Sequence, residues 1–195
     1  MRSLINYVAV AWLVVSFLGV SSMAQAGSHP GLTMSAAEVK SIRAQLHSVP
    51  KAKQAFDALR ATTDSGIEAG VIVPIPVDAG GGYTHEQHKR NYQLMLDAGL
   101  FYQLSGSKRY AVYVRDVLLA YAEMYPGLPL HPHQKEQSPG KLFWQSLNEA
   151  VWLVHTIQAY DLIVSSLSQT ERERIETSLL RPVAHFLSEG QPTTV

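Results

Sequence analysis

The sequence of 195 residues contains no cysteine and carries no excess charge of either sign. Without cysteine, the chain can form no disulfide, cysteine zinc finger, iron–sulfur cluster or thiol nucleophile. It also lacks the cysteine that anchors a bacterial lipoprotein. Its 16 basic residues balance its 16 acidic residues, so the sequence has no cationic surplus of the kind typical of nucleic-acid-binding proteins. We therefore expect no nucleic-acid partner.

Motifs for nucleotide binding and metal-assisted hydrolysis are missing as well. The sequence contains no P-loop, no Rossmann glycine pattern and no Gly-x-Ser-x-Gly nucleophile elbow. The segment His85-Glu-Gln-His88 is one residue shorter than the zinc-binding HExxH motif. His131-Pro-His133 offers two imidazoles without a third ligand. The sequence therefore predicts no metal site and no cofactor in this segment.

The first 26 residues have the pattern of a secretory signal peptide. Arg2 precedes an apolar run over residues 7–20, and Ala24-Gln25-Ala26 provides a cleavage site with small residues. The apolar run is shorter than the about 20 residues that a transmembrane helix needs. We predict cleavage after Ala26, which leaves residues 27–195 without a stable membrane anchor. A bacterial periplasmic or secreted location follows from this prediction.

The remainder of the sequence predicts helices and very little strand. Ser35-Ala-Ala-Glu38, Thr84-His-Glu-Gln87 and Ser168-Gln-Thr-Glu171 each have the pattern of a capping box at a helix start. Prolines and glycines interrupt the helical pattern at 70–83 and 126–139.

These signals predict six helices joined as consecutive hairpins, an all-α fold. The predicted helices lie between residues 35 and 50, at 50–69, at 84–104, between 107 and 126, at 140–164 and after 168. Proline at position 182 should bend or end the last helix.

The helix predicted at 140–164 has one narrow polar stripe opposite a broad apolar side, at about 100° per residue. The polar stripe consists of Lys141, Gln145, Asn148, Trp152 and His155. The apolar side consists of Phe143, Leu147, Ala150, Val151, Val154 and Ile157. Amides and a cation can hold carboxylates and hydroxyls, and tryptophan can offer a flat face to a sugar ring. The stripe indicates either a ligand cleft or a buried polar network between helices.

A second candidate site is the start of the helix predicted at 84–104. Tyr83, His85 and Lys89 crowd its first turns, together with further histidine, arginine and tyrosine residues. Backbone amides at a helix N-terminus favour anions, and the glycines at 80–82 allow a close approach to a ligand. The alternative is a solvated helix start at which the histidines act as caps.

Four segments carry a family resemblance: HPGL at 29–32, GGGYTHEQHKRN at 80–91, YPGLPLHPH at 125–133 and GKLFWQSLNEAVWLVHTIQAYD at 140–161. They resemble the N-terminal region of alginate lyases, most closely the exolytic oligoalginate lyases of polysaccharide lyase family 17. The resemblance implies that residues 27–195 are the N-terminal portion of an incomplete (α/α)6 toroid. In that family the toroid continues well beyond this length, and a β-sheet domain follows it.

The resemblance also implies β-elimination on an alginate or oligo-uronate substrate. In the family, an Asn-His pair and later tyrosines supply the principal catalytic groups, and this sequence contains no Asn-His pair. We therefore expect the catalytic residues beyond residue 195, and a truncated fragment that forms one wall of the cleft. Three hairpins would form half of a ring, so we also expect an exposed apolar helix face.

Gln145 is the best match for a contact to substrate carboxylate or hydroxyl groups. The further candidates for substrate binding are Asn148, Lys141, Tyr83, His85 and Lys89. A non-catalytic periplasmic glycan-binding module and a helical interaction protein are the alternative functions.

Overall fold

The computed structural model describes residues 29–189, and every regular element within this range is helical. The α-helices are α1 (Ala36–Ser48), α2 (Pro50–Glu68), α3 (Tyr83–Ser105), α4 (Lys108–Met124), α5 (Ser146–Ile163), α6 (Gln169–Ile175) and α7 (Arg181–Glu189). The all-α prediction is confirmed for this range. The predicted signal peptide at 1–26 lies outside the described residues. Among the described helices, none combines the length and the apolar character needed to cross a membrane.

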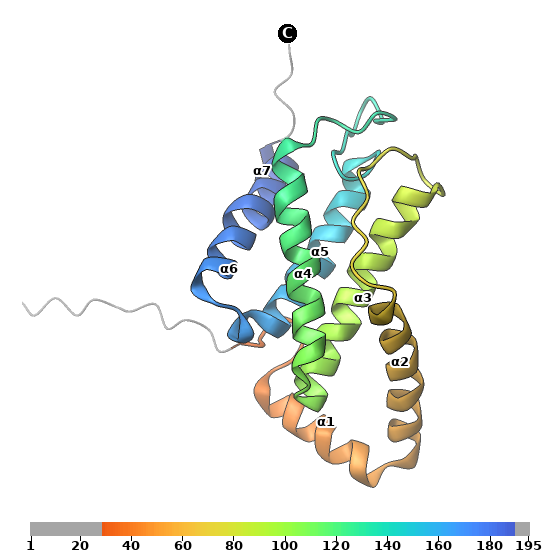
Figure 1. The fold of residues 1–195 in the computed structure, drawn as a ribbon, viewed down its shortest axis with the longest axis vertical. Coiled ribbons are helices and arrows are strands. Elements are labelled where there is room, and N and C mark those ends of the chain that lie inside the picture. Colours follow the sequence, from red (N-terminus) through yellow and green to blue (C-terminus); the bar gives the residue numbers. More distant parts are fainter. Residues whose placement is uncertain (1–28, 190–195) are drawn as a thin grey trace, which may run out of the picture.

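The helices alternate in direction along the chain (Figure 1). α3 and α5 run the same way, and α4 and the α6–α7 rod return in the opposite direction. α1 and α2 pack together at the end of the molecule where α3 finishes. The N-terminal ends of α3 and α5 therefore lie at the same end of the molecule.

Two of the three predicted capping boxes are present. The Ser35 hydroxyl accepts the Glu38 N–H, while the Glu38 carboxylate accepts the Ser35 N–H at 2.7 Å. Ser168 and Glu171 repeat this arrangement at the start of α6. Each box satisfies backbone donors that the first helical turn leaves free, so these two helix starts follow directly from the local sequence.

α5 starts at Ser146, later than the predicted residue 140, and the prediction of its faces is wrong. Trp152, expected on the wet polar stripe, is completely buried. Leu147, Val151 and Val154, expected on the buried side, are 65, 40 and 55% exposed. The helix packs on α3 through its other side, because a periodic pattern shows where apolar residues gather but not where a neighbour lies. The three exposed side chains form the apolar stripe of α5, as expected for a helix face without a partner.

The core lies between α3, α4, α5 and the α6–α7 rod. The rings of Tyr121 and Trp152 meet edge to face with centroids 4.9 Å apart. A Cβ atom at Gly99 would lie 3.0 Å from the Leu162 side chain and 3.5 Å from the Ala159 carbonyl oxygen. Glycine at this position therefore allows α3 and α5 to approach closely.

A buried polar network connects the extended segment 70–82 to α3 and α4. Asn91 Nδ2 donates to the Ile72 carbonyl at 2.8 Å and to the Tyr121 hydroxyl at 3.0 Å. Burial lowers the pKa of His88 to about 3, so its imidazole is neutral at physiological pH. Its Nδ1 is hydrogen-bonded to the Tyr121 hydroxyl at 2.9 Å. These bonds hold the segment that precedes α3 against the core.

The last helical rod continues through Pro182 instead of ending there. A π-helical segment at Glu176–Leu180 separates α6 from α7 and comes directly before Arg181-Pro182. Proline has no N–H to donate and its ring crowds the preceding turn, and a widened turn accommodates both effects.

Asp161 ties the first described residues to α5. Its carboxylate is 3% exposed and accepts the N–H groups of Gly31 and Leu32 at 2.8 and 2.9 Å. His29 Nδ1 lies 2.5 Å from the other carboxylate oxygen. Burial acts to raise the pKa of Asp161, but the hydrogen bonds from Leu32, Gly31 and His29 outweigh it and lower the pKa below its ordinary value.

We expect Asp161→Asn to lower the free energy of unfolding by about 1–3 kcal/mol at neutral pH, because buried backbone donors lose a charged acceptor. A depressed carboxyl pKa contributes stability above the unfolded-state pKa, and this contribution is lost as pH falls through the folded-state value. The difference in Tm between the variant and the wild type should therefore shrink in acid. Thermal unfolding followed by circular dichroism over a pH series measures it. Asp116→Asn, at a partly exposed acid on α4, serves as the control. A Tm difference that does not change with pH would contradict this account.

Candidate functional site

The candidate site lies where the N-terminal ends of α3 and α5 meet the two loops that precede them. The loop 70–82 runs along α3 from the end of α2 and reaches the end of the molecule where the loop 128–145 lies (Figure 1). They touch: a Cβ atom at Gly80 would lie 3.3 Å from the Trp144 indole nitrogen. The glycine-rich loop therefore passes directly beside the residue that precedes Gln145.

Three of the predicted site residues form a hydrogen-bonded row, here called the amide row. Gln145 Nε2 donates to Asn148 Oδ1 at 2.8 Å, and Asn148 Nδ2 donates to His85 Nε2 at 3.3 Å. His85 is 5% exposed, and burial lowers its pKa, so its ring is neutral and can accept. Within residues 29–189, no hydrogen bond uses the Gln145 carboxamide oxygen or its second N–H. The amide row thus ends in one free acceptor and one free donor.

The other predicted site residues lie at its edge or apart from it. Lys89 pairs with Glu86 at 3.0 Å, and Glu86 in turn comes within 3.8 Å of His85. Tyr83 is 60% exposed on the first turn of α3. The ammonium group of Lys141 lies over two aromatic rings, one of them on α7, with 5.6 Å to each centroid. The structure therefore gathers Gln145, Asn148 and His85, and directs Lys141 toward α7.

Trp144 is an aromatic candidate that the sequence analysis missed. It is partly exposed beside Gly80, whereas Trp152 is buried in the core and the ring of His155 packs against Tyr92 of α3, with centroids 4.6 Å apart. A signal was present in the sequence. Ser146-Leu-Asn-Glu149 has the spacing of a capping box, which would have started the helix near residue 146 and left Trp144 in the loop.

The N-terminal end of α3 already holds a carboxylate of the protein itself. Asp78 accepts the N–H and the O–H of Thr84 at 2.9 and 3.0 Å, and the backbone hydrogen bond lowers the pKa of Asp78. The predicted cap at Thr84 is therefore wrong, because Gly82 is the N-cap residue and Thr84 lies inside the first turn. The anion-favouring position at this helix end is filled from the loop.

One ring nitrogen of the histidine pair in the 128–145 loop already has a partner within the loop. His131 is 2% exposed, and its Nδ1 accepts the His133 N–H at 3.1 Å. In the part of the chain that the structure describes, no three histidine, aspartate or glutamate side chains are grouped to hold a metal ion.

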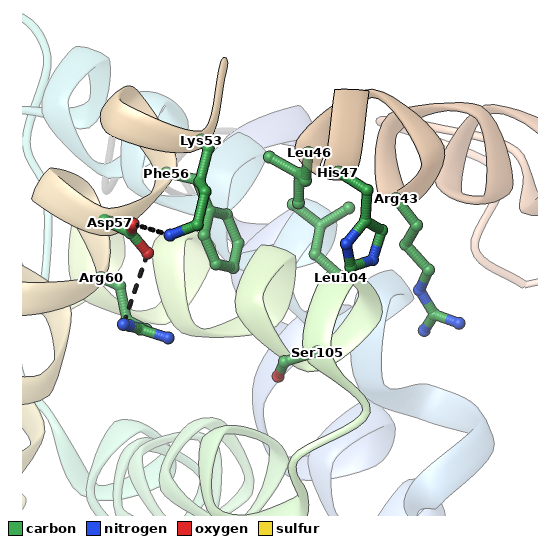
Figure 2. Close-up of a pocket in the computed structure, with 9 residues that line it drawn as sticks. All are labelled: Arg43, Leu46, His47, Lys53, Phe56, Asp57, Arg60, Leu104 and Ser105. Atoms are coloured by element: carbon green, nitrogen blue, oxygen red, sulfur yellow. Dashed lines mark hydrogen bonds and ion pairs between the residues drawn. The ribbon is translucent and has the colours of Figure 1, made fainter. Parts of the chain in front are cut away.

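A separate hollow of about 410 Å³ lies between α1, α2 and the C-terminal end of α3 (Figure 2). Its strong cations already have acceptors: Lys53 and Arg60 pair with Asp57, and Arg43 donates to the Gln103 carbonyl. The hollow keeps a surplus of positive charge, because the single carboxylate of Asp57 pairs with two cations and Arg43 meets an uncharged carbonyl. It lies apart from the amide row.

The segment before α5 is held by a buried carboxylate. Glu149 is completely buried and accepts the N–H groups of Lys141 and Leu142 at 2.7 and 3.1 Å. It also accepts the Tyr125 O–H at 2.6 Å. Burial raises the pKa of Glu149 against the opposing effect of these donors. A Cβ atom at Gly140 would lie 2.3 Å from the Phe143 carbonyl oxygen and 2.8 Å from Glu149 Oε2. The hydrogen bonds to Glu149 and the close contacts at Gly140 therefore restrict the backbone of residues 140–145 to one conformation.

Comparison with curated proteins identifies two related enzymes. The chain is 45% identical over 192 residues to the exo-oligoalginate lyase of Saccharophagus degradans. The aligned region covers 97% of this chain and 26% of that protein. It is 53% identical over 127 residues to the alginate lyase of Stenotrophomonas maltophilia. This aligned region covers 65% of this chain and 17% of that protein. No family model matches the chain. The resemblance to alginate lyases is thus confirmed, and the chain spans about a quarter or less of the length of these relatives.

We expect Gly140→Ala to destabilise the protein by about 1–3 kcal/mol, because the added methyl group overlaps the Phe143 carbonyl and the Glu149 carboxylate. Chemical denaturation at constant pH measures the change. Gly127→Ala is the matched control, since a Cβ atom at Gly127 meets nothing within 4 Å. Equal free energies of unfolding for the two variants would contradict a restricted backbone conformation of residues 140–145.

Proposed function

Because the chain is homologous to alginate lyases over nearly its whole length, we propose that it forms part of a polysaccharide lyase that acts on alginate or oligo-uronate chains by β-elimination. The observation that carries this proposal is the 45% identity over 97% of the chain to an exo-oligoalginate lyase. The chain accounts for only 26% of that relative's length. In the proposal it therefore supplies one wall of the cleft, and the principal catalytic residues belong to the remaining length.

The reaction defines what this wall has to do. A base removes the proton from C5 of the uronate, the electron pair forms the C4–C5 double bond, and the C4–O4 bond breaks as O4 leaves and takes up a proton. The charge that develops on the uronate carboxylate needs hydrogen-bond donors placed in advance. A cleft wall can supply such donors and fix the sugar without performing either proton transfer.

The amide row suits this task. The free N–H of Gln145 can donate to a uronate carboxylate, and its free oxygen can accept a sugar hydroxyl. Its neighbours Asn148 and His85 fix the carboxamide from one side through the bonds at 2.8 and 3.3 Å. Trp144 adds a partly exposed aromatic side chain next to it, of the kind that packs on sugar rings. Lys89 lies at the edge as a cation that neutralises Glu86.

The proposal includes an (α/α)6 toroid for the longer protein. Successive helices that alternate in direction support it, and so does the apolar stripe of α5, formed by Leu147, Val151 and Val154. In the toroid, a helix from the remaining length covers this stripe. The proposal further places the protein in the bacterial periplasm or outside the cell after removal of residues 1–26, and assigns no metal or cofactor to residues 27–195.

Binding and elimination assays on the purified chain test the proposed function. We expect the chain to bind alginate oligomers in isothermal titration calorimetry, and to release almost none of the unsaturated, ultraviolet-absorbing product. Gln145→Ala should raise the Kd about tenfold, which corresponds to about 1.4 kcal/mol, the scale of a hydrogen bond to a charged group. Gln93→Ala, at an exposed glutamine on α3, is the control and should leave the Kd unchanged.

The outcomes separate the candidate functions. Rapid product formation would show that the catalytic residues are within this chain, against the proposal. If neither the wild type nor the Gln145→Ala variant binds alginate oligomers, the result would instead favour a helical interaction protein.

The apolar stripe of α5 leads to a separate prediction. Without a covering helix, the stripe should cause self-association, because each buried leucine or valine contributes about 1.5–3 kcal/mol. Leu147→Lys combined with Val154→Lys should keep the chain monomeric at concentrations where the wild type associates. Sedimentation velocity measures this. Leu59→Lys combined with Val112→Lys, at two positions that are each 42% exposed, is the control pair. A wild-type chain that stays monomeric at every concentration would argue against an unpartnered face.

A further inference from the structure

We propose that Glu149 is a positioning residue for substrate binding: its carboxylate fixes the 140–145 segment and thereby sets where the Gln145 carboxamide points. This inference rests on the proposed function, since it assigns a task to a residue behind the same wall. Glu149 itself is completely buried and does not reach a ligand.

The two carboxylate oxygens of Glu149 have separate partners. Oε1 accepts the Tyr125 O–H at 2.6 Å, which links α5 to the turn at the end of α4. Oε2 accepts the backbone N–H groups of Lys141 and Leu142, which lie in the segment that leads to Gln145. One side chain thus joins α5 to the segment directly before it and to the turn at the end of α4. A carboxylate accepts from all three donors, whereas an amide has a single oxygen and would face one of these partners with its NH2 group.

This carboxylate does not act as an ordinary helix cap. Although Ser146 and Glu149 have capping-box spacing, the Ser146 N–H donates to the Ser138 carbonyl at 2.9 Å. Glu149 is directed instead at the non-helical residues before the helix. Gln145 is the last of these residues and the N-cap residue of α5. The backbone that Glu149 holds therefore ends at the residue whose side chain begins the amide row.

α5 carries a matched control for a purely structural role. Asp161 is also almost completely buried and also accepts two consecutive backbone N–H groups, from Gly31 and Leu32. It secures a different segment, near the other end of the helix. Replacing either acid by its amide removes a buried acceptor oxygen from the same helix, but only Glu149 faces the segment that carries Gln145.

The experiment compares Glu149→Gln with Asp161→Asn in the complete chain. We expect both variants to lower the Tm. Only Glu149→Gln should shift the 1H–15N resonances of the Gln145 side-chain amide and raise the Kd for alginate oligomers about tenfold, the loss of one well-placed contact. Tyr125→Phe, which removes one donor and keeps the carboxylate, should shift the same resonances by a smaller amount. It serves as the second variant if Glu149→Gln does not fold.

The outcomes distinguish this inference from the proposed function. If Gln145→Ala weakens binding while Glu149→Gln and Tyr125→Phe change neither the Gln145 resonances nor the Kd, the positioning role is overturned and the proposed function stands. If the wild type binds no oligomer, the proposed binding role fails. The resonances then still decide the positioning role: a shift in the Glu149 variant that is absent from Asp161→Asn supports it, and equal spectra overturn it.

Discussion

The packing of α3 against α5 determines where His85 and Asn148 of the amide row meet. The two helices approach closely at Gly99, where a side chain would collide with Leu162. Because both helices run in the same direction, this contact also brings their first turns together (Figure 1). His85 on one helix then meets Asn148 on the other, and the loops before the two helices meet at this end of the molecule. A bulkier residue at the crossing would separate these groups without touching any of them.

Local signals in the sequence predicted the helices well, and contacts between distant residues account for the errors. Ser35 with Glu38 determines a helix start within four consecutive residues, so it could be recognised. The start of α3 depends on Asp78 in the preceding loop, which displaced Thr84 from the expected capping role. The buried side of α5 depends on which neighbours reach it. Trp152 was therefore misplaced, although its membership in a helix was predicted correctly.

The site was predicted in part for the same reason. Gln145, Asn148 and His85 were chosen on residue type and family resemblance, and the fold brings them together. Their surroundings are close to neutral in charge, since Lys89 faces Glu86 and the pKa of His85 is lowered by burial. In our proposal, an anionic sugar is therefore recognised mainly through oriented amide dipoles, which keep their hydrogen-bonding capacity at any physiological pH. The i,i+3 spacing of Glu86 and Lys89 is a sequence pattern that indicates this pairing.

The π-helical segment at Glu176–Leu180 has a consequence for chain length. Such a segment fits one more residue into a turn than an α-helix does, so the backbone after it is rotated by about 100° relative to a regular continuation. A homologue with a single deletion inside this stretch would form a straight rod, and all of α7 would turn to present a different side. Phe186 would then leave the Lys141 ammonium group that now lies over its ring. Insertions and deletions at this point would thus change side-chain register at a distance, while the loops stay the same length.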